Sequence, residues 1–182
     1  MSAWLVLGAL ALHAGGGITP EMIRARHAGA RSLAADIVQT KEGRYWARPL
    51  VSHIRLRWTP ARVEWEILDP VHSTVVIEGE RLRVLTDKGS RDMGAVAGDP
   101  RFTALLRFLR ALASFDLAAL ERDFSLSWGA RDIVATPREG AGLGVLKLVR
   151  LEFDDAGEIR RIDVETAAET TRIEFRNVER VR

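Results

Sequence analysis

Cysteine is absent from all 182 residues of the chain. Its absence excludes disulfide bonds, thiolate metal sites and a cysteine nucleophile. A lipid-modified amino-terminal cysteine is excluded as well, so we expect no stable membrane anchor. The fold must therefore rest on an apolar core, and 182 residues are enough for one domain with a substantial core.

An excess of one sign of charge is also lacking. The 27 basic and 25 acidic residues sum to a formal net charge of only +2. Proteins that bind nucleic acid through its phosphates usually concentrate positive charge, so we expect no nucleic-acid partner. The sequence also has no GxSxG, HExxH or comparable catalytic pattern, and we expect neither an enzyme nor a cofactor.

The amino-terminal apolar run, residues 3–12, is too short to cross a bilayer, which takes about 20 residues. It suits the hydrophobic region of a secretory signal, with small residues after it and a cleavage point after Ala14. No Lys or Arg precedes the run, and the alternative is an amino-terminal helix packed on the domain. We expect residues 1–17 to be a signal peptide and residues 18–182 to form a single domain.

The rest of the chain is organised around residues 54–79, whose polarity alternates with period two on both sides of Thr59-Pro60-Ala61. The alternation predicts a β-hairpin, and Asp69-Pro70 separates it from a third strand. Successive side chains point to opposite faces of a strand, so arginine and glutamate side chains share one face. The other face carries apolar side chains from both strands: Ile54, Leu56, Trp58, Val63, Trp65 and Ile67.

Further strands are predicted by period two or by β-branched residues, for a total of about ten. They lie at residues 33–40, 73–77, 81–85, near 91, and at 124–128, 133–135, 145–153, 159–165 and 170–178. Residues 41–43 are interpreted as a turn. Helices are predicted at residues 20–29, 101–112 and 116–122, and the middle one carries an apolar stripe: Phe102, Leu105, Leu106, Leu109 and Leu112.

Each candidate polar site has an ordinary structural alternative. His53 and His72 could hold a metal only by meeting across strands, so we expect surface histidines and no metal site. Glu64 and Glu66 could mimic a catalytic carboxylate pair, but cross-strand ion pairs with arginines of the preceding strand are favoured. The glycine-rich residues 140–144 lack the strand-to-helix context of a phosphate-binding loop, which favours a hairpin loop.

Several short motifs follow one another in a definite order: Ile37-Val38-Gln39, then Leu56, Pro60, Trp65, Pro70 and an apolar strand ending in Gly79. By this order and spacing the chain, from about residue 32 to its end, resembles the LolA-type outer-membrane lipoprotein carriers of the bacterial periplasm, especially the shorter LolA-like proteins. It departs from their pattern at Ile37 (often Phe), His53 (often Gly) and Thr59 (usually Arg). In that family the arginine is implicated in holding the helical lid closed, so the same latch is not expected at Thr59.

The resemblance implies an α+β fold that is mainly β, with a single curved antiparallel sheet forming a half-open barrel covered by lid helices. It implies a monomeric periplasmic carrier that shields the acyl chains of lipoproteins, or of another amphipathic lipid, on the way to the outer membrane. An inner-membrane loading complex and an outer-membrane acceptor would be its partners. The lining would combine the apolar hairpin residues with side chains of the lid: Phe102, Leu105, Leu106 and Leu109.

The same residues are compatible with a filled core, in which the helical stripe packs directly on the hairpin. An alternative function follows from that interpretation. The chain would then be a protein-interaction or sensory module on the same half-barrel, binding a partner protein and no lipid. The presence of bound lipid separates the two functions.

Overall fold

The computed structural model describes residues 17–79, 81–92, 107, 108, 110, 111, 114 and 116–182. These residues form an antiparallel sheet of 11 strands with the order β6-β5-β4-β3-β2-β1-β11-β10-β9-β8-β7. The strands are β1 (Ser32–Gly43), β2 (Leu50–Thr59), β3 (Arg62–Asp69), β4 (Ser73–Glu78), β5 (Arg81–Thr86), β6 (Gly89–Asp92), β7 (Phe124–Trp128), β8 (Asp132–Pro137), β9 (Leu146–Phe153), β10 (Ile159–Thr166) and β11 (Glu169–Val181).

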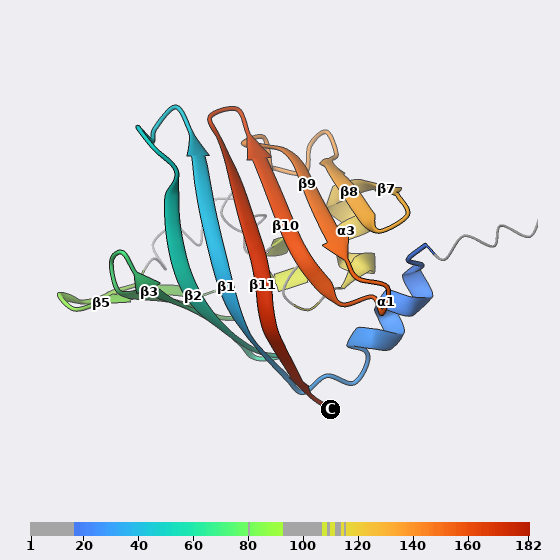
Figure 1. The fold of residues 1–182 in the computed structure, drawn as a ribbon, viewed down its shortest axis with the longest axis horizontal. Helices are drawn as coiled ribbons and strands as arrows, with labels where there is room; N and C mark the ends of the chain where they lie inside the picture. Colours follow the sequence, from blue (N-terminus) through green and yellow to red (C-terminus); the bar gives the residue numbers. More distant parts are fainter. Residues whose placement is uncertain (1–16, 80, 93–106, 109, 112–113, 115) are drawn as a thin grey trace, which may run out of the picture.

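The first and last strands pair in the middle of the sheet. The register of β1 and β11 runs from Ser32 opposite Val181 to Gly43 opposite Glu169. Strands β2–β6 therefore form one wing and β10–β7 the other, and both curve away behind β1 and β11 in Figure 1. Because β6 and β7 end the order and do not pair with each other, the sheet formed by the described residues stays open. The expected mainly β, half-open architecture is confirmed.

The central hairpin has the predicted register. Leu56 lies opposite Trp65, and the flanking pairs are Ile54 with Ile67 and Trp58 with Val63, so all of these side chains share the inner, concave face. At the turn, the Thr59 hydroxyl accepts a hydrogen bond from the backbone N–H of Arg62 at 3.1 Å. A polar side chain that bonds nearby backbone stabilises a turn, so local sequence accounts for this hairpin.

The interpretation of residues 41–43 as a turn is wrong, because β1 continues to Gly43. Lys41 pairs with Leu50 of β2 on one side and with Thr171 of β11 on the other. Pairing with these two long strands overrides the local preference for a turn. Gly43 has a φ of 151°, and a Cβ there would lie 2.3 Å from the carbonyl oxygen of Ala168. Glycine is thus required where this strand end meets the β10–β11 turn.

Helices α1 and α3 of the described residues lie beside the strands. Helix α1 (Pro20–His27) begins as predicted, with the Thr19 hydroxyl accepting a hydrogen bond from the N–H of Met22 at 3.2 Å. Its Ile23 is completely buried. Helix α3 (Leu117–Asp123) is capped by the Asp116 carboxylate, which accepts from the N–H of Ala119 at 3.0 Å. None of the helices in the described part of the chain is long and apolar enough to cross a membrane.

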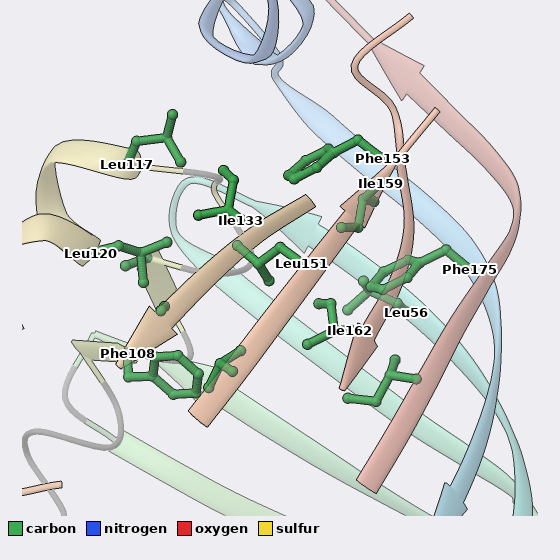
Figure 2. Packing of buried hydrophobic residues seen from close by; sticks show 14 of the residues in the cluster. Leu56, Phe108, Leu117, Leu120, Ile133, Leu151, Phe153, Ile159, Ile162 and Phe175 are labelled. Carbon is green, nitrogen blue, oxygen red and sulfur yellow. The ribbon is translucent and has the colours of Figure 1, made fainter. Parts of the chain in front are cut away.

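Apolar side chains of α3 pack against the wing β7–β10. Figure 2 shows Leu117 and Leu120 of α3 facing the strands that carry Ile133 and Leu151, with Phe108 on the same side of the sheet. The largest fully buried side chains of this wing have at most 2% of their surface exposed: Phe124, Ile133, Val149, Leu151, Phe153 and Ile159. This wing is a filled hydrophobic core.

Candidate functional site

The apolar hairpin residues converge on the inner face but are not equally covered. Ile54, Leu56 and Val63 are buried, whereas Trp58, Trp65 and Ile67 are half-buried and pack on the core cluster. Strand parity therefore placed all of them correctly on one apolar face. The remaining residues of the predicted lining, Phe102, Leu105, Leu106 and Leu109, lie outside the described residues.

The two wings differ in how completely their inner faces are covered. On β8–β10, side chains such as Ile133 and Leu151 are inaccessible. On β3–β5, the inner-face positions Trp65 and Val75 and the neighbouring Leu82 are half-buried. An apolar surface left partly accessible on a concave face is a favourable site for an apolar ligand.

Helical residues that precede α3, here called the bridging residues (107, 108, 110, 111 and 114), contact both wings. The Phe108 and Phe124 rings lie 5.2 Å apart between centroids, which attaches these residues to β7. The Arg110 guanidinium donates from Nη1 to the carbonyl oxygen of Gly79 at 3.1 Å, which attaches them to the β4–β5 turn. The bridging residues therefore span the open side of the curved sheet.

The predicted helical stripe did not include Phe108, although Phe108 is 4% and Ala111 6% exposed. Successive residues of an α-helix are about 100° apart, so Phe108 lies well to one side of a stripe that contains Leu109. The three-residue spacing of Phe108 and Ala111 is itself an apolar helical pattern, and this spacing could have indicated that both side chains are buried. The segment thus buries a face that the stripe did not predict.

A pocket of about 280 Å³ lies where the β2–β3 turn meets the bridging residues. Its apolar wall includes Trp58, Val63 and Ile77, and its polar groups include Arg62, Arg110 and Ser114. Thr59 of the β2–β3 turn lines the same pocket. Arg110 is a cation of the bridging residues that reaches this pocket and bonds the β4–β5 turn.

The Arg62 charge in this pocket is already matched. Its Nη1 donates to Glu78 at 2.7 Å and its Nη2 to Glu64 at 3.0 Å. Arg110, in contrast, has no carboxylate partner among the described residues, and its recorded hydrogen bond is to the neutral carbonyl of Gly79. The pocket therefore carries one positive charge that the described residues around it do not neutralise.

Glu64 and Glu66 form the ion pairs expected on the outer face. Glu64 lies 2.8 Å from Arg57, and Glu66 lies 3.5 Å from Arg55 and 3.5 Å from Arg57. The interpretation of these carboxylates as cross-strand partners of arginine is confirmed. Cross-strand opposite charges on a half-solvated face stabilise strand pairing modestly.

The histidines considered as metal ligands contact acids on the surface. His53 Nδ1 lies 2.9 Å from Asp69, and His72 lies 3.7 Å from Glu66 and 3.6 Å from Asp87. Across the described ranges, no group of three or more His, Asp or Glu residues is arranged to hold a metal ion.

The glycine-rich residues 140–144 connect β8 to β9, which pair antiparallel, so the hairpin-loop interpretation is confirmed. The loop is anchored by Leu143, which is 3% exposed. A strand follows it, and the strand-to-helix geometry of a phosphate loop does not occur at this position.

A buried ionic cluster lies where α1 meets the sheet. Glu158 receives hydrogen bonds from Arg180 at 2.7 and 2.8 Å and from Arg26 at 2.9 Å. Burial by itself would raise the pKa of Glu158, but the hydrogen bonds and charge of Arg180, joined by those of Arg26, outweigh burial and lower it. Arg180 also donates to His27 Nδ1 at 3.2 Å. The cluster thus attaches α1 to β10 and β11.

Comparison with known proteins finds similarity at the level of the fold. No protein-family model matches the chain, and no curated protein matches it in sequence. A LolA superfamily protein from Nitrosomonas europaea matches over 91% of this chain and 94% of its own, with 11% identity and a TM-score of 0.45.

Two further solved structures are similar in the same way. A DUF1329 family protein from Desulfovibrio piger matches over 88% of this chain and 90% of its own, with 9% identity and a TM-score of 0.49. The lipoprotein LppX from Mycobacterium tuberculosis matches over 88% and 96%, with 10% identity and a TM-score of 0.45. These likenesses concern the arrangement of the fold alone, and each of the three TM-scores lies below 0.5.

Proposed function

We propose that this protein is a carrier that shields the acyl chains of a lipoprotein, or of another amphipathic lipid, against the inner face of its open sheet. The observation that carries the proposal is the unequal cover of that face. The wing β7–β10 is a filled core, while Trp58, Trp65 and Leu82 on the other wing remain partly accessible. An apolar chain laid along this wing would complete its burial.

The energetics of such a carrier favour partial cover over a sealed cavity. Each buried methylene contributes about 0.8 kcal/mol, so a fully enclosed 16-carbon chain would gain up to about 12 kcal/mol. A gain of that size corresponds to nanomolar binding and slow release. A half-covered wing would retain the chain less strongly, which suits a protein that must deliver its cargo. The proposal includes no covalent chemistry.

Export supports the same role. The apolar run at residues 3–12, interpreted as a secretory signal, would bring the domain of residues 18–182 to the periplasm. A lipid passing between two membranes there requires a soluble shield for its chains. The sequence resemblance to LolA-type carriers supports delivery towards the outer membrane, with a loading complex and an acceptor as partners.

Two leucines of one strand provide a matched test. Leu82 lies opposite Ile77 and packs, half-buried, on the inner-face cluster, whereas Leu85 is 37% exposed and lies on the outer face. We expect Leu82→Glu to lower the affinity for a fluorescent 16-carbon fatty acid at least tenfold, because its carboxylate would need to be desolvated beside the chain. Leu85→Glu should bind the probe as the parent does.

Thermal unfolding of both variants accompanies the binding measurement, because a closed core would respond differently. If Leu82 belongs to a closed core, Leu82→Glu loses its cooperative transition and the parent takes up no probe. That pair of results would reject the carrier and favour the protein-interaction module. Native mass spectrometry of the protein from its periplasmic extract gives an independent check, since a carrier retains lipid adducts.

A further inference from the structure

The pocket beside the β2–β3 turn combines an apolar wall with a cation that has no carboxylate partner in the described part of the chain. Trp58, Val63 and Ile77 supply the wall, and Arg110 supplies the charge. A guanidinium has five N–H donors, and Arg110 uses one of them on the Gly79 carbonyl. The remaining donors are available to a ligand that enters the pocket.

The neighbouring charges decide which ligand this pocket favours. Arg62 is held by Glu64 and Glu78, so its charge is compensated from outside the pocket. None of the described residues that line the pocket is a carboxylate. A cationic ligand would meet Arg110 unfavourably, whereas a carboxylate or phosphate could accept a charge-assisted, bidentate pair of hydrogen bonds.

The size of the pocket limits what part of a ligand it can hold. Its volume of about 280 Å³ lies just below the range of complete small-molecule sites, roughly 300–1,000 Å³. It suits one anionic group and the first few methylenes attached to it. The rest of a long chain would continue from Trp58 along the half-buried inner face towards Trp65, which lies two residues beyond Val63, the partner of Trp58 on the adjoining strand.

We propose that this pocket binds the anionic end group of an amphipathic lipid, a carboxylate or a phosphate, through Arg110. The proposal rests on the carrier function and adds the polarity of the cargo to it. An ionised acceptor forms stronger hydrogen bonds with a guanidinium than a neutral carbonyl does. The bound anion would accept from the N–H groups of Arg110 that are not donated to Gly79.

Three probes with the same 16-carbon chain isolate the end group: palmitate, hexadecyl phosphate and hexadecanol, each below its critical micelle concentration at pH 7.5. The parent should bind one or both anions about tenfold more tightly than the alcohol, a difference of about 1.4 kcal/mol. Arg110→Gln should abolish this preference and leave the hexadecanol affinity unchanged. Arg110→Lys should retain most of it, and added salt should weaken it because Arg110 is exposed.

Arg107→Gln is the matched control, because Arg107 is an exposed arginine of the same bridging residues that faces Asp123 at 3.7 Å and does not line the pocket. It should keep the preference for anions. Equal affinity of the parent for all three probes, or an equal loss for all three in Arg110→Gln, overturns the end-group site and leaves the carrier standing. Failure of the parent to bind any probe overturns both. A preference between palmitate and hexadecyl phosphate identifies the end group.

Discussion

The rings of Phe108 and Phe124 lie 5.2 Å apart between centroids and are tilted by 38° relative to each other. Phe124 begins β7 and is completely buried, and Phe108 is 4% exposed. The contact therefore attaches the bridging residues firmly to the filled wing. Aromatic pairs in tilted geometry contribute about 0.5–1.5 kcal/mol beyond the area that they bury.

Replacing Phe108 with alanine should lower the free energy of unfolding by about 3–5 kcal/mol, because it leaves a cavity against Phe124. Urea denaturation measures the loss. Arg107→Ala is the adjacent control, and it should change the free energy of unfolding by less than about 1 kcal/mol, since Arg107 is exposed. A small effect of Phe108→Ala would mean that the bridging residues do not stabilise the fold.

The sequence predicted most of the strands because their signal is local. Alternation at Ile54, Leu56 and Trp58 fixes both the strand and its inward face, and the observed register agrees. The pairing of β1 with β11 could not be predicted from such a signal, because nothing local distinguishes one apolar strand as the partner of another. The open, mainly β architecture was predicted from the order of the short motifs and not from the pairing of particular strands.

The candidate site was predictable to the same extent. Its apolar lining follows from strand parity, whereas the contact of Arg110 with Gly79 joins residues far apart in the chain and has no sequence signal. The sequence resemblance singled out Thr59 only as a position without the expected arginine. It could not indicate that a cation reaches the same pocket from the helical side.

Glu158 should be essential to the attachment of α1. Its Arg180 partner is 8% exposed at the side chain and Glu158 is 7% exposed, so the pair is buried. Glu158→Gln would leave the Arg180 charge buried without its counter-ion, and breaking a buried pair in this way costs about 3–5 kcal/mol. Chemical denaturation of the variant and the parent at pH 7.5 gives the difference in the free energy of unfolding.

The matched control is a surface pair from the same region. Arg131 and Asp155 lie 2.6 Å apart with side chains 61% and 72% exposed. Asp155→Asn should change the free energy of unfolding by less than about 1 kcal/mol, because water screens an exposed pair. Equal effects of Glu158→Gln and Asp155→Asn would show that the buried cluster is not the special attachment of α1.

Stability should also fall in mild acid because of His27. Burial, followed by the charge of Arg180, lowers the pKa of His27 from 6.5 to about 4, although the Glu158 charge and a backbone contact with Gly157 act in the opposite direction. The unfolded chain then takes up a proton more readily than the folded protein does, so protonation favours unfolding. The stability is complete above pH 6.5, declines as the pH falls towards 4, and is lost below that value.

The urea midpoint measured between pH 7.5 and 4.5 tests this dependence. His27→Gln cannot titrate, so its midpoint should decline less than that of the parent over this range. The pKa of Glu158 is lowered from its ordinary value of 4.5, so Glu158 lowers the stability only below that pH. The effects of His27 and Glu158 therefore fall in different pH ranges. Identical pH profiles of His27→Gln and the parent would contradict the assignment to His27.

Val76 provides the last prediction, because it is buried on the face that meets water. It lies opposite Glu64 and Arg83 on the neighbouring strands, yet only 1% of its surface is exposed. The apolar stems of long charged side chains can cover such a position while their charged groups stay in water. Val76→Ala should therefore lower the free energy of unfolding by about 2 kcal/mol, as a core substitution does.

Glu64→Gln removes one charge from the ion pairs above Val76 and should lower the free energy of unfolding by less than about 1 kcal/mol. Urea denaturation of both variants decides between packing and charge: a larger loss for Glu64→Gln than for Val76→Ala would show that the ion pairs, and not the covered valine, stabilise this part of the sheet.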